Sequence, residues 1–353
     1  IMKQEELIMK KRMLGLLLTA ALVLGVTGCG NTTEKKTTEQ ANGSSEELTT
    51  EAGETQTVRL GVWTGGIDHY LAVVGTEQGI FQKHGIDLET TEFASGINTI
   101  DAIVTGQLDI GMIADFAGVN RIGNTQDNFD SKIIGRYVTA TGWALYVNED
   151  EVKDLSDLAG KGFGTIPGTI TDYYAALTYE KAGIAADEQK LVNIDSTQAM
   201  LGVVDSGEVV AGWSSGASAK KLEEHGMKKF LSMEDLGISV DAYYVASKDI
   251  LTEHEDLVED FLAAIKETEE WITANPDEAA GIVEDKTGIP KDQAAANIEA
   301  TTLLLDFKQD SVEHLDAIKE WAVGAGMFEK DYDVKDYVDT TALEKLFPDA
   351  VEN

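Results

Sequence analysis

Short apolar runs alternate with helix-like stretches in the chain after residue 57. The run "VRLGVWT" (58–64) predicts a buried strand, and Gly65 and Gly66 are expected to open a helix that continues to about Gln82. The run "DLETTEF" (87–93) then alternates between apolar and polar residues, which predicts a second strand. The apolar period therefore switches from two residues to about 3.6 and back again, which is typical of an α/β protein.

A second helix and a third strand follow. Ser95 can cap a helix that has Ile97, Ile100 and Ile103 on one face, and "LDIGMIA" (108–114) is the next apolar run. The order strand, helix, strand, helix, strand predicts a parallel sheet with right-handed crossovers.

The same order of elements returns about one hundred residues later, where "PGTITDYYAA" (167–176) matches "TGGIDHYLAV" (64–73). We interpret the match as a duplication that gives two α/β lobes. The matched pairs are Gly65 with Gly168 and Tyr70 with Tyr173 at an offset of 103, and Ser95 with Ser196, Gly106 with Gly207 and Gly111 with Gly212 at an offset of 101.

The remaining apolar runs connect the lobes and then give way to helix. Strands are expected at residues 131–138 and 142–148, leading out of the first lobe, and at 241–247, leading out of the second. From Leu251 onward the pattern predicts almost all helix, with a capping box formed by Thr252 and Glu255. Because this tail shows no strand signal, we expect it to pack on the first lobe.

The N-terminal pattern predicts export. Lys10, Lys11 and Arg12 precede an apolar run at residues 14–26, which is about 13 residues long and too short to span a bilayer. Together with the residues before it, Cys29 resembles the lipobox of bacterial lipoproteins, which implies lipidation of Cys29 and an extracytoplasmic protein anchored to the bacterial cell membrane. The expected divisions are a signal peptide (1–28), a flexible Thr/Glu/Ser-rich tether (29–57), the first lobe (58–142), the second lobe (143–243), a mainly helical return to the first lobe (244–347) and a short tail (348–353).

Composition narrows the functional classes. The formal net charge is −35, so nucleic acid and anionic membrane surfaces are poor partners. Cys29 is the single cysteine, so the mature chain has no thiol for a disulfide or a nucleophile once this residue is acylated. We expect a monomer that needs no cofactor and no metal.

Two open α/β lobes joined by two crossings predict a hinged cleft, because open sheets bind ligands beyond the carboxyl ends of their strands. Helix N-termini there favour a compact oxyanion, whereas Asp115 and Asp241 favour an ammonium or amidine group, so a zwitterion would use both. Trp63, Tyr173 and Trp213 can form an apolar wall. The predicted ligand-binding residues are Trp63, Thr64, Gly65, Gly66, Ser95, Asp115, Phe116, Gly168, Thr169, Thr171, Tyr173, Trp213, Ser214 and Asp241.

Two other functional classes have weaker support in the sequence. An enzyme on the same fold would need a positioned acid/base pair, yet the histidines are scattered and His69 alone lies near a predicted cleft loop. A surface adhesin is suggested by the acidic run at 253–270, although its helical spacing is that of a solvated face. We predict a binding protein and not an enzyme.

Four motifs give the chain a family resemblance. They are "EQGIFQKHGIDLE" (77–89), "GQLDIGM" (106–112), "DLSDLAGKGFGTIPGT" (154–169) and "DYVDTTALEKLF" (336–347). With these the chain resembles substrate-binding proteins of ABC importers in the nitrate, sulfonate and taurine class, which also includes binders of pyrimidine thiamine precursors. The resemblance implies a type II periplasmic-binding-protein fold, capture of a sulfonate- or taurine-like solute and its delivery to a membrane permease. A thiamine-precursor pyrimidine and nitrate remain alternatives for the solute.

Overall fold

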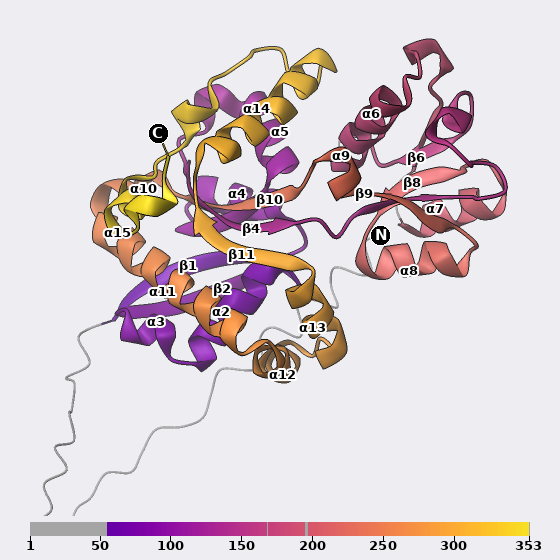
Figure 1. Ribbon diagram of the computed structural model, residues 1–353. Helices are drawn as coiled ribbons and strands as arrows, with labels where there is room; N and C mark the ends of the chain where they lie inside the picture. Colours follow the sequence, from indigo (N-terminus) through magenta and orange to yellow (C-terminus); the bar gives the residue numbers. More distant parts are fainter. Residues whose placement is uncertain (1–54, 168, 195–196, 353) are drawn as a thin grey trace, which may run out of the picture. The chain divides into compact units, whose positions relative to one another are not determined.

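The computed structural model describes residues 55–167, 169–194 and 197–352. These residues form two β-sheets with helices around them (Figure 1). The first sheet has the spatial order β11 (Thr301–Asp306), β4 (Lys132–Ala140), β10 (Val240–Ala246), β3 (Ile110–Ala114), β1 (Gln56–Trp63) and β2 (Ile86–Phe93). The second sheet has the order β7 (Leu191–Asn193), β6 (Phe163–Thr165), β8 (Ala211–Ser214), β5 (Ala144–Val147) and β9 (Lys228–Ser232). We call the parts of the chain built on these sheets the first and the second lobe.

The predicted duplication is confirmed by the order of the strands. In the first lobe the order is β2-β1-β3-β10-β4, and in the second lobe it is β7-β6-β8-β5-β9. Helices α4 (Gly96–Val104) and α7 (Thr197–Asp205) occupy matching places 101 residues apart. Gly106 and Gly207 follow these helices with φ of +72° and +74°, a conformation that favours glycine.

The parallel arrangement predicted for the strand-helix units is confirmed, although each complete sheet is mixed. Strands β2 and β3 are parallel to β1, and β7 and β8 are parallel to β6, but β10 and β5 are antiparallel to their neighbours. Strands β5 and β10 each enter their sheet from the other lobe, β5 after β4 and β10 after β9, and therefore run against the duplicated unit. Because β10 begins at Val240, the chain is back in the first lobe before the expected boundary at residue 243.

Helices cover both faces of the first sheet, as Figure 1 shows. Helix α2 (Ile67–Glu77) contacts α11 (Glu255–Ala274) and α12 (Pro276–Thr287), whereas α5 (Asp115–Thr125) contacts α14 (Gln309–Gly324). The other first-lobe helices are α3 (Ile80–Lys83), α10 (Lys248–Glu253), α13 (Lys291–Glu299) and α15 (Thr341–Leu346). The second-lobe helices are α6 (Ile170–Ala182), α7, α8 (Gly216–Glu224) and α9 (Met233–Leu236), and 3-10 turns lie at Gln126–Asn128, Leu155–Leu158, Ala186–Glu188, Val334–Tyr337 and Pro348–Ala350.

The tail packs on the first lobe as expected, but it is not helix alone. Residues Thr301–Asp306 form β11, which pairs with β4 at the edge of the first sheet. The predicted capping box is also wrong, because Thr252 donates to the carbonyl of Lys248 inside α10 and His254 is the residue before α11. The helix expected to run from Gly66 to Gln82 is interrupted, since α2 ends at Glu77 and Gly79 has a left-handed backbone ahead of α3.

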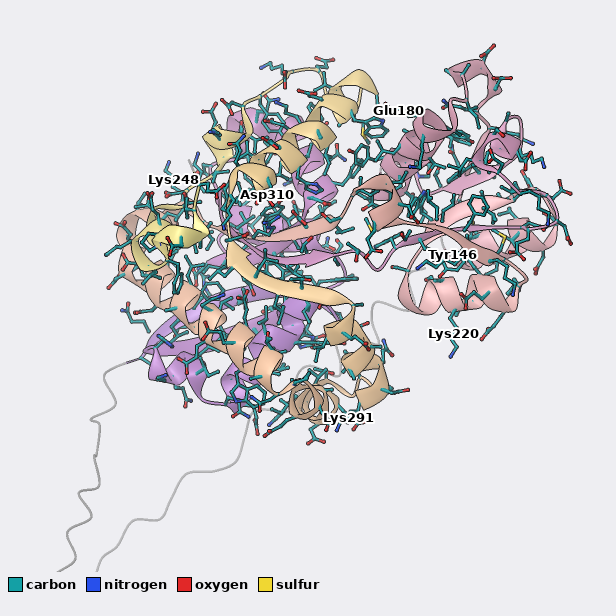
Figure 2. All side chains as sticks on the ribbon, in the orientation of Figure 1. Tyr146, Glu180, Lys220, Lys248, Lys291 and Asp310 are labelled. Carbon is teal, nitrogen blue, oxygen red and sulfur yellow. The ribbon has the colours of Figure 1, made fainter. Side chains whose placement is uncertain are left out.

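Apolar side chains form two cores. The larger core fills the first lobe and continues onto the α6 side of the second sheet, and the smaller one lies between the second sheet and helices α7 and α8. Charged side chains such as Glu180 and Lys220 are exposed on the outside (Figure 2). In the part of the chain described, no helix is both long and apolar enough to span a membrane.

Several expectations fall on residues outside the described part. These are the signal peptide, Cys29 and its lipidation, the tether up to residue 54, the site residue Gly168, and Ser196 of the duplicated pattern. Gln56 and Thr57, assigned to the tether, are the first residues of β1.

Candidate functional site

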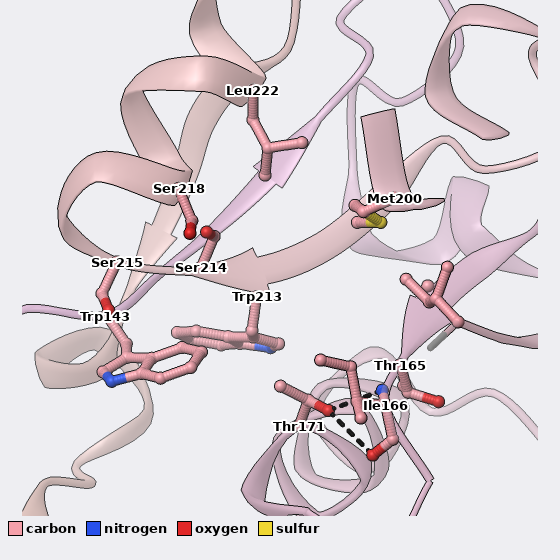
Figure 3. A pocket seen from close by; sticks show the side chains of 12 residues that line it. Trp143, Thr165, Ile166, Thr171, Met200, Trp213, Ser214, Ser215, Ser218 and Leu222 are labelled. Atoms are coloured by element: carbon pink, nitrogen blue, oxygen red, sulfur yellow. Dashed lines mark hydrogen bonds between the residues drawn. The ribbon is translucent and has the colours of Figure 1, made fainter. Parts of the chain in front are cut away.

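A pocket of about 200 Å³ lies at the carboxyl ends of the parallel strands β6 and β8 in the second lobe (Figure 3). This is the edge at which open α/β sheets bind ligands. The lining residues are Trp143, Gly164, Thr165, Ile166, Thr171, Ile194, Met200, Trp213, Ser214, Ser215, Ser218 and Leu222.

The turn after β6 is held by threonine hydroxyl groups. Thr169 precedes α6, and its Oγ1 accepts from the backbone N–H of Thr171 at 3.3 Å and donates to the carbonyl of Ile166 at 2.7 Å. The backbone N–H of Ile166 in turn donates to Oγ1 of Thr171 at 2.9 Å. These bonds fix Ile166 and Thr171 at the pocket wall, whereas Thr169 itself stabilises the turn from beside it.

The turn after β8 leads directly into a helix N-terminus. Ser214 ends β8, and Ser215 precedes α8 without a side-chain bond to the first-turn N–H groups. Free N–H groups and the helix dipole at such an end favour a negatively charged ligand group. The sequence 214–218, "SSGAS", therefore places hydroxyl groups and a helix start at one side of the pocket.

Aromatic side chains form another part of the wall. The ring of Trp213 lies 5.3 Å from that of Tyr174 between centroids, and its Nε1 donates to Oγ1 of Thr178 at 2.9 Å. Trp143 meets the same Tyr174 edge-on at 6.1 Å. Tyr174 is fully buried, so it supports both tryptophan rings from behind.

Glycines allow Met200 to approach the sheet. A Cβ on Gly212 would lie 2.2 Å from Cε of Met200, and a Cβ on Gly164 would lie 2.7 Å from its Sδ. Both strand positions therefore need a glycine or a displaced Met200. The result is an apolar floor for the pocket next to its aromatic wall.

Among the lining residues that the structure describes there is no Asp, Glu, Lys, Arg or His. The available polar groups are hydroxyls of Ser and Thr and backbone amides. Such a lining can hold an anionic or neutral group by hydrogen bonds, but it offers no carboxylate to an ammonium group.

Of the predicted second-lobe residues, Thr171, Trp213 and Ser214 line the pocket. The predicted first-lobe residues do not line it. Trp63 is 48% exposed at the end of β1, and Thr64 donates its hydroxyl to the carbonyl of Phe93. Gly65 and Gly66 form the turn before α2, with φ of +78° at Gly65, and Ser95 precedes α4 with its hydroxyl on Oδ1 of Asn98.

Phe116 and Tyr173 lie close together, but their rings pack against each other and do not face the pocket. Their ring centroids are 6.5 Å apart, and Trp321 of α14 lies 5.9 Å from Phe116 and 5.3 Å from Tyr173. We call Phe116, Tyr173 and Trp321 the interlobe aromatic cluster, because Phe116 belongs to α5 of the first lobe and Tyr173 to α6 of the second. These rings join the lobes and do not line the pocket.

Asp115 and Asp241 lie in a buried polar network of the first lobe. Oδ2 of Asp115 accepts from the backbone N–H of Asp241 at 2.9 Å and from Nε2 of His314 at 2.8 Å. Oδ2 of Asp241 accepts from Nη1 of Arg136 at 2.9 Å. Both carboxylates are 1% exposed and already bonded, so they offer no free group at the surface.

The pKa values in this network reflect its opposite charges. Burial lowers the pKa of His314, but the hydrogen bond and the charge of Asp115 raise it, and the pKa lies above its ordinary value. Burial raises the pKa of Asp241, yet the charge of His314 and the hydrogen bonds from Thr139 and Arg136 lower it below its ordinary value. The network thus contains cationic partners that sequence spacing did not reveal.

Two other buried groups stand near the first strand-to-helix turn. Asp68 accepts from the backbone N–H of Trp63 at 2.6 Å, and burial raises the pKa of its carboxyl to about 7. Burial lowers the pKa of His69, which is 5% exposed and 3.8 Å from Oε2 of Glu92. Within the described residues, no group of three or more His, Cys, Asp or Glu side chains is placed to hold a metal ion.

Sequence reasoning missed part of the lining. Trp143 stands in the first crossing, and Met200 and Leu222 lie on helices, where apolar residues are usually assigned to the core. The Ser-rich start of α8 was the usable signal for Ser215 and Ser218.

The fold is shared with known binding proteins. Over 80% of this chain and 97% of that chain, it matches the periplasmic aliphatic sulphonate binding protein SsuA from Escherichia coli, with a TM-score of 0.68 at 15% identity. It also matches the desulfurization enzyme DszB, with a TM-score of 0.61 at 13% identity over 83% of this chain and 99% of that one. The periplasmic-binding-protein fold implied by the sequence resemblance is confirmed.

Sequence comparison gives the family. The chain is 23% identical over 346 residues to a Bacillus subtilis protein named as an aliphatic sulfonates-binding protein, with 94% of this chain and 96% of that protein covered. A family model described as NMT1/THI5 like matches residues 67–279. Because this match spans more than half of the 353 residues, the chain belongs to the NMT1/THI5-like family.

Proposed function

We propose that this protein is an extracytoplasmic solute-binding lipoprotein that captures a small sulfonate-type solute and delivers it to an ABC importer permease. Lipidation of Cys29 would anchor it to the bacterial cell membrane, and Gly168 would contribute to ligand binding. The single observation that supports the proposal most is the pocket at the ends of β6 and β8, next to the N-terminus of α8, whose described lining residues are uncharged.

The chemistry of a sulfonate suits this lining. Its three oxygens share one negative charge and accept several hydrogen bonds, which the hydroxyl groups of Ser214 and Ser215 and the first-turn amides of α8 are able to donate. The apolar and aromatic wall then surrounds the rest of the solute. The B. subtilis relative named for aliphatic sulfonates agrees with this substrate class.

Binding is favoured over catalysis by the composition of the pocket. The lining residues in the described part of the chain include hydroxyl groups but no His, Asp, Glu, Lys or Cys that would serve as a general base for them. The fold neighbour DszB is named as an enzyme, so turnover is a real alternative on this fold. Release of sulfite from an added sulfonate by the purified protein would contradict the binding function.

The test is isothermal titration calorimetry of the mature protein with propane-1-sulfonate, taurine, nitrate and hydroxymethyl-aminopyrimidine. We expect propane-1-sulfonate to bind, and we expect Trp213→Ala to weaken that binding at least about ten-fold, because a pocket wall is lost. Leu191→Ala, at an exposed second-lobe position, is the control and should leave affinity unchanged. Binding heat with the pyrimidine or nitrate, and none with either sulfonate, would identify one of those two solutes as the ligand in place of a sulfonate.

A further inference from the structure

We infer that the pocket selects a small aromatic oxyanion of about the size of benzenesulfonate, with its ring against Trp143 and Trp213 and its anionic group at the start of α8. This inference rests on the proposed function and specifies the solute of the same site. Three features support it: the volume of the pocket, the chemistry of its wall and the position of its polar groups.

The volume fits a ring and a compact head group. An apolar cavity of about 150 Å³ binds benzene in an engineered protein. The pocket here measures about 200 Å³, so it accommodates a ring of that size together with part of an attached anionic group. A two- or three-carbon chain leaves much of this apolar space unfilled.

The wall is rich in groups that favour an aromatic ring. Trp143 and Trp213 offer ring faces and edges, and Met200 offers a polarisable sulfur. Ile166 and Ile194 complete an apolar surface. The tryptophans are held in place by Tyr174, which contacts both rings and is fully buried, so the wall is formed before a solute arrives.

Three serines lie where the anionic group would bind, whereas Thr165 and Thr171 line another side of the pocket (Figure 3). Figure 3 shows Ser214, Ser215 and Ser218 on one side of the pocket, on the strand end and first turn that lead into α8. Of the lining residues described, none has a carboxylate, so a solute with an ammonium group would lose the hydration of that group without gaining an ionic partner among them. We therefore expect the pocket to prefer a solute with an uncharged body over taurine.

Calorimetry with matched solutes tests the inference. Benzenesulfonate and cyclohexanesulfonate have the same charge and similar size but differ in the ring, and we expect benzenesulfonate to bind about two- to ten-fold more tightly. Propane-1-sulfonate and taurine differ in a methyl and an ammonium group, and we expect taurine to bind more weakly. Quenching of tryptophan emission by benzenesulfonate provides a second signal from the same titration.

Variants connect the preference to the wall. Trp143→Leu keeps an apolar side chain but removes the ring, and it should lower the benzenesulfonate-to-cyclohexanesulfonate affinity ratio toward one. Trp213→Phe keeps a ring and should retain most of the ratio, and Trp271→Leu in α11 of the first lobe should leave it unchanged. Thermal melting of each variant shows that the fold is intact.

Two outcomes overturn the inference in different ways. If cyclohexanesulfonate or taurine binds at least as tightly as benzenesulfonate, the aromatic preference is wrong while the proposed sulfonate-binding function stands. If none of the four sulfonates binds the wild-type protein, the proposed function fails and the inference fails with it.

Discussion

At the scale of single residues, buried ionisable groups of the first lobe determine how stability responds to pH. Glu269 of α11 is 2% exposed, its Oε1 has no hydrogen-bond partner among the described residues, and its Oε2 lies 3.3 Å from Nζ of Lys266. Burial raises the pKa of its carboxyl to about 8. The folded protein therefore keeps a proton on Glu269 at pH values where the unfolded chain has lost it.

This difference predicts that stability falls as the pH rises from about 5 to about 8. In that window the native state binds one more proton at Glu269 than the unfolded state, which lowers the free energy of unfolding by up to about 1.4 kcal/mol per pH unit. Glu269→Gln removes the titrating group and should flatten the curve. Urea denaturation at several pH values measures the effect, and Glu270→Gln, an exposed neighbour, is the control. Equal slopes in wild type and Glu269→Gln would show that Glu269 is ionised in the native state.

A second residue-scale prediction concerns the carboxylates that the sequence places near the ligand. Asp241→Asn should reduce the free energy of unfolding by about 1 to 3 kcal/mol, because it removes one of the carboxylates bonded to the buried Arg136, which keeps its ion pair with Asp306. It should leave the affinity for propane-1-sulfonate unchanged, since Asp241 is 1% exposed and does not line the pocket. Chemical denaturation and calorimetry on the same sample check both parts. A loss of affinity much larger than that for Leu191→Ala would place Asp241 in the binding site.

At the scale of secondary-structure elements, two glycines of the second lobe have different surroundings. Backbone atoms approach Gly162 closely, whereas Gly202 has open space around it. A Cβ at Gly162, just before β6, would lie 1.9 Å from the backbone oxygen of Glu208. A Cβ at Gly202, inside α7, would meet nothing within 4 Å. The two positions therefore differ in the room available for a side chain, and neither has a positive φ.

The pair gives opposite predictions for the same substitution. Gly162→Ala should destabilise the protein by at least about 2 kcal/mol, because backbone atoms cannot yield as a flexible side chain does. Gly202→Ala should stabilise it by about 0.5 to 1 kcal/mol, since alanine loses less entropy in a helix. Thermal melting of both variants measures these effects. A lower melting temperature for Gly202→Ala than for the wild type would show that neighbouring atoms leave no room for a Cβ at this position of α7.

Elements were predicted well where the signal is local and poorly where it depends on distant partners. The duplicated strand-helix units follow from apolar periodicity and from glycines at fixed offsets, and they are present. Strand β11 was missed because its short run, "TTLLLD", follows a helix and becomes a strand by pairing with β4, some 160 residues earlier. The antiparallel direction of β5 and β10 likewise depends on how the chain crosses between lobes.

The same distinction applies to the candidate site. Trp213 and Ser214 end strand β8 and Thr171 lies in the first turn of α6 after β6, so their position at the carboxyl edge was predictable. The burial of Asp115 and Asp241 was not, because their cationic partners His314 and Arg136 lie about 200 and 105 residues away in sequence. A carboxylate beside a predicted cleft loop is indistinguishable in sequence from one that forms a buried ion pair.

At the scale of the whole molecule, the crossing strands and the C-terminal tail connect the two duplicated lobes. Each lobe takes one strand from the other half of the chain, β5 into the second sheet and β10 into the first, and the interlobe aromatic cluster adds a contact from α14. The pocket at the ends of β6 and β8 lies at one of the two equivalent edges produced by the duplication. We therefore propose that a sulfonate-type solute binds at this edge of the second lobe.

The most direct test is a crystal structure of the mature protein grown with a sulfonate that binds in calorimetry. We predict electron density for the solute in the pocket lined by Trp143, Trp213 and Met200, with the sulfonate oxygens within hydrogen-bond distance of Ser214, Ser215 or the first-turn amides of α8. Density for the solute at the first lobe alone, with the second-lobe pocket occupied by water, would contradict the account.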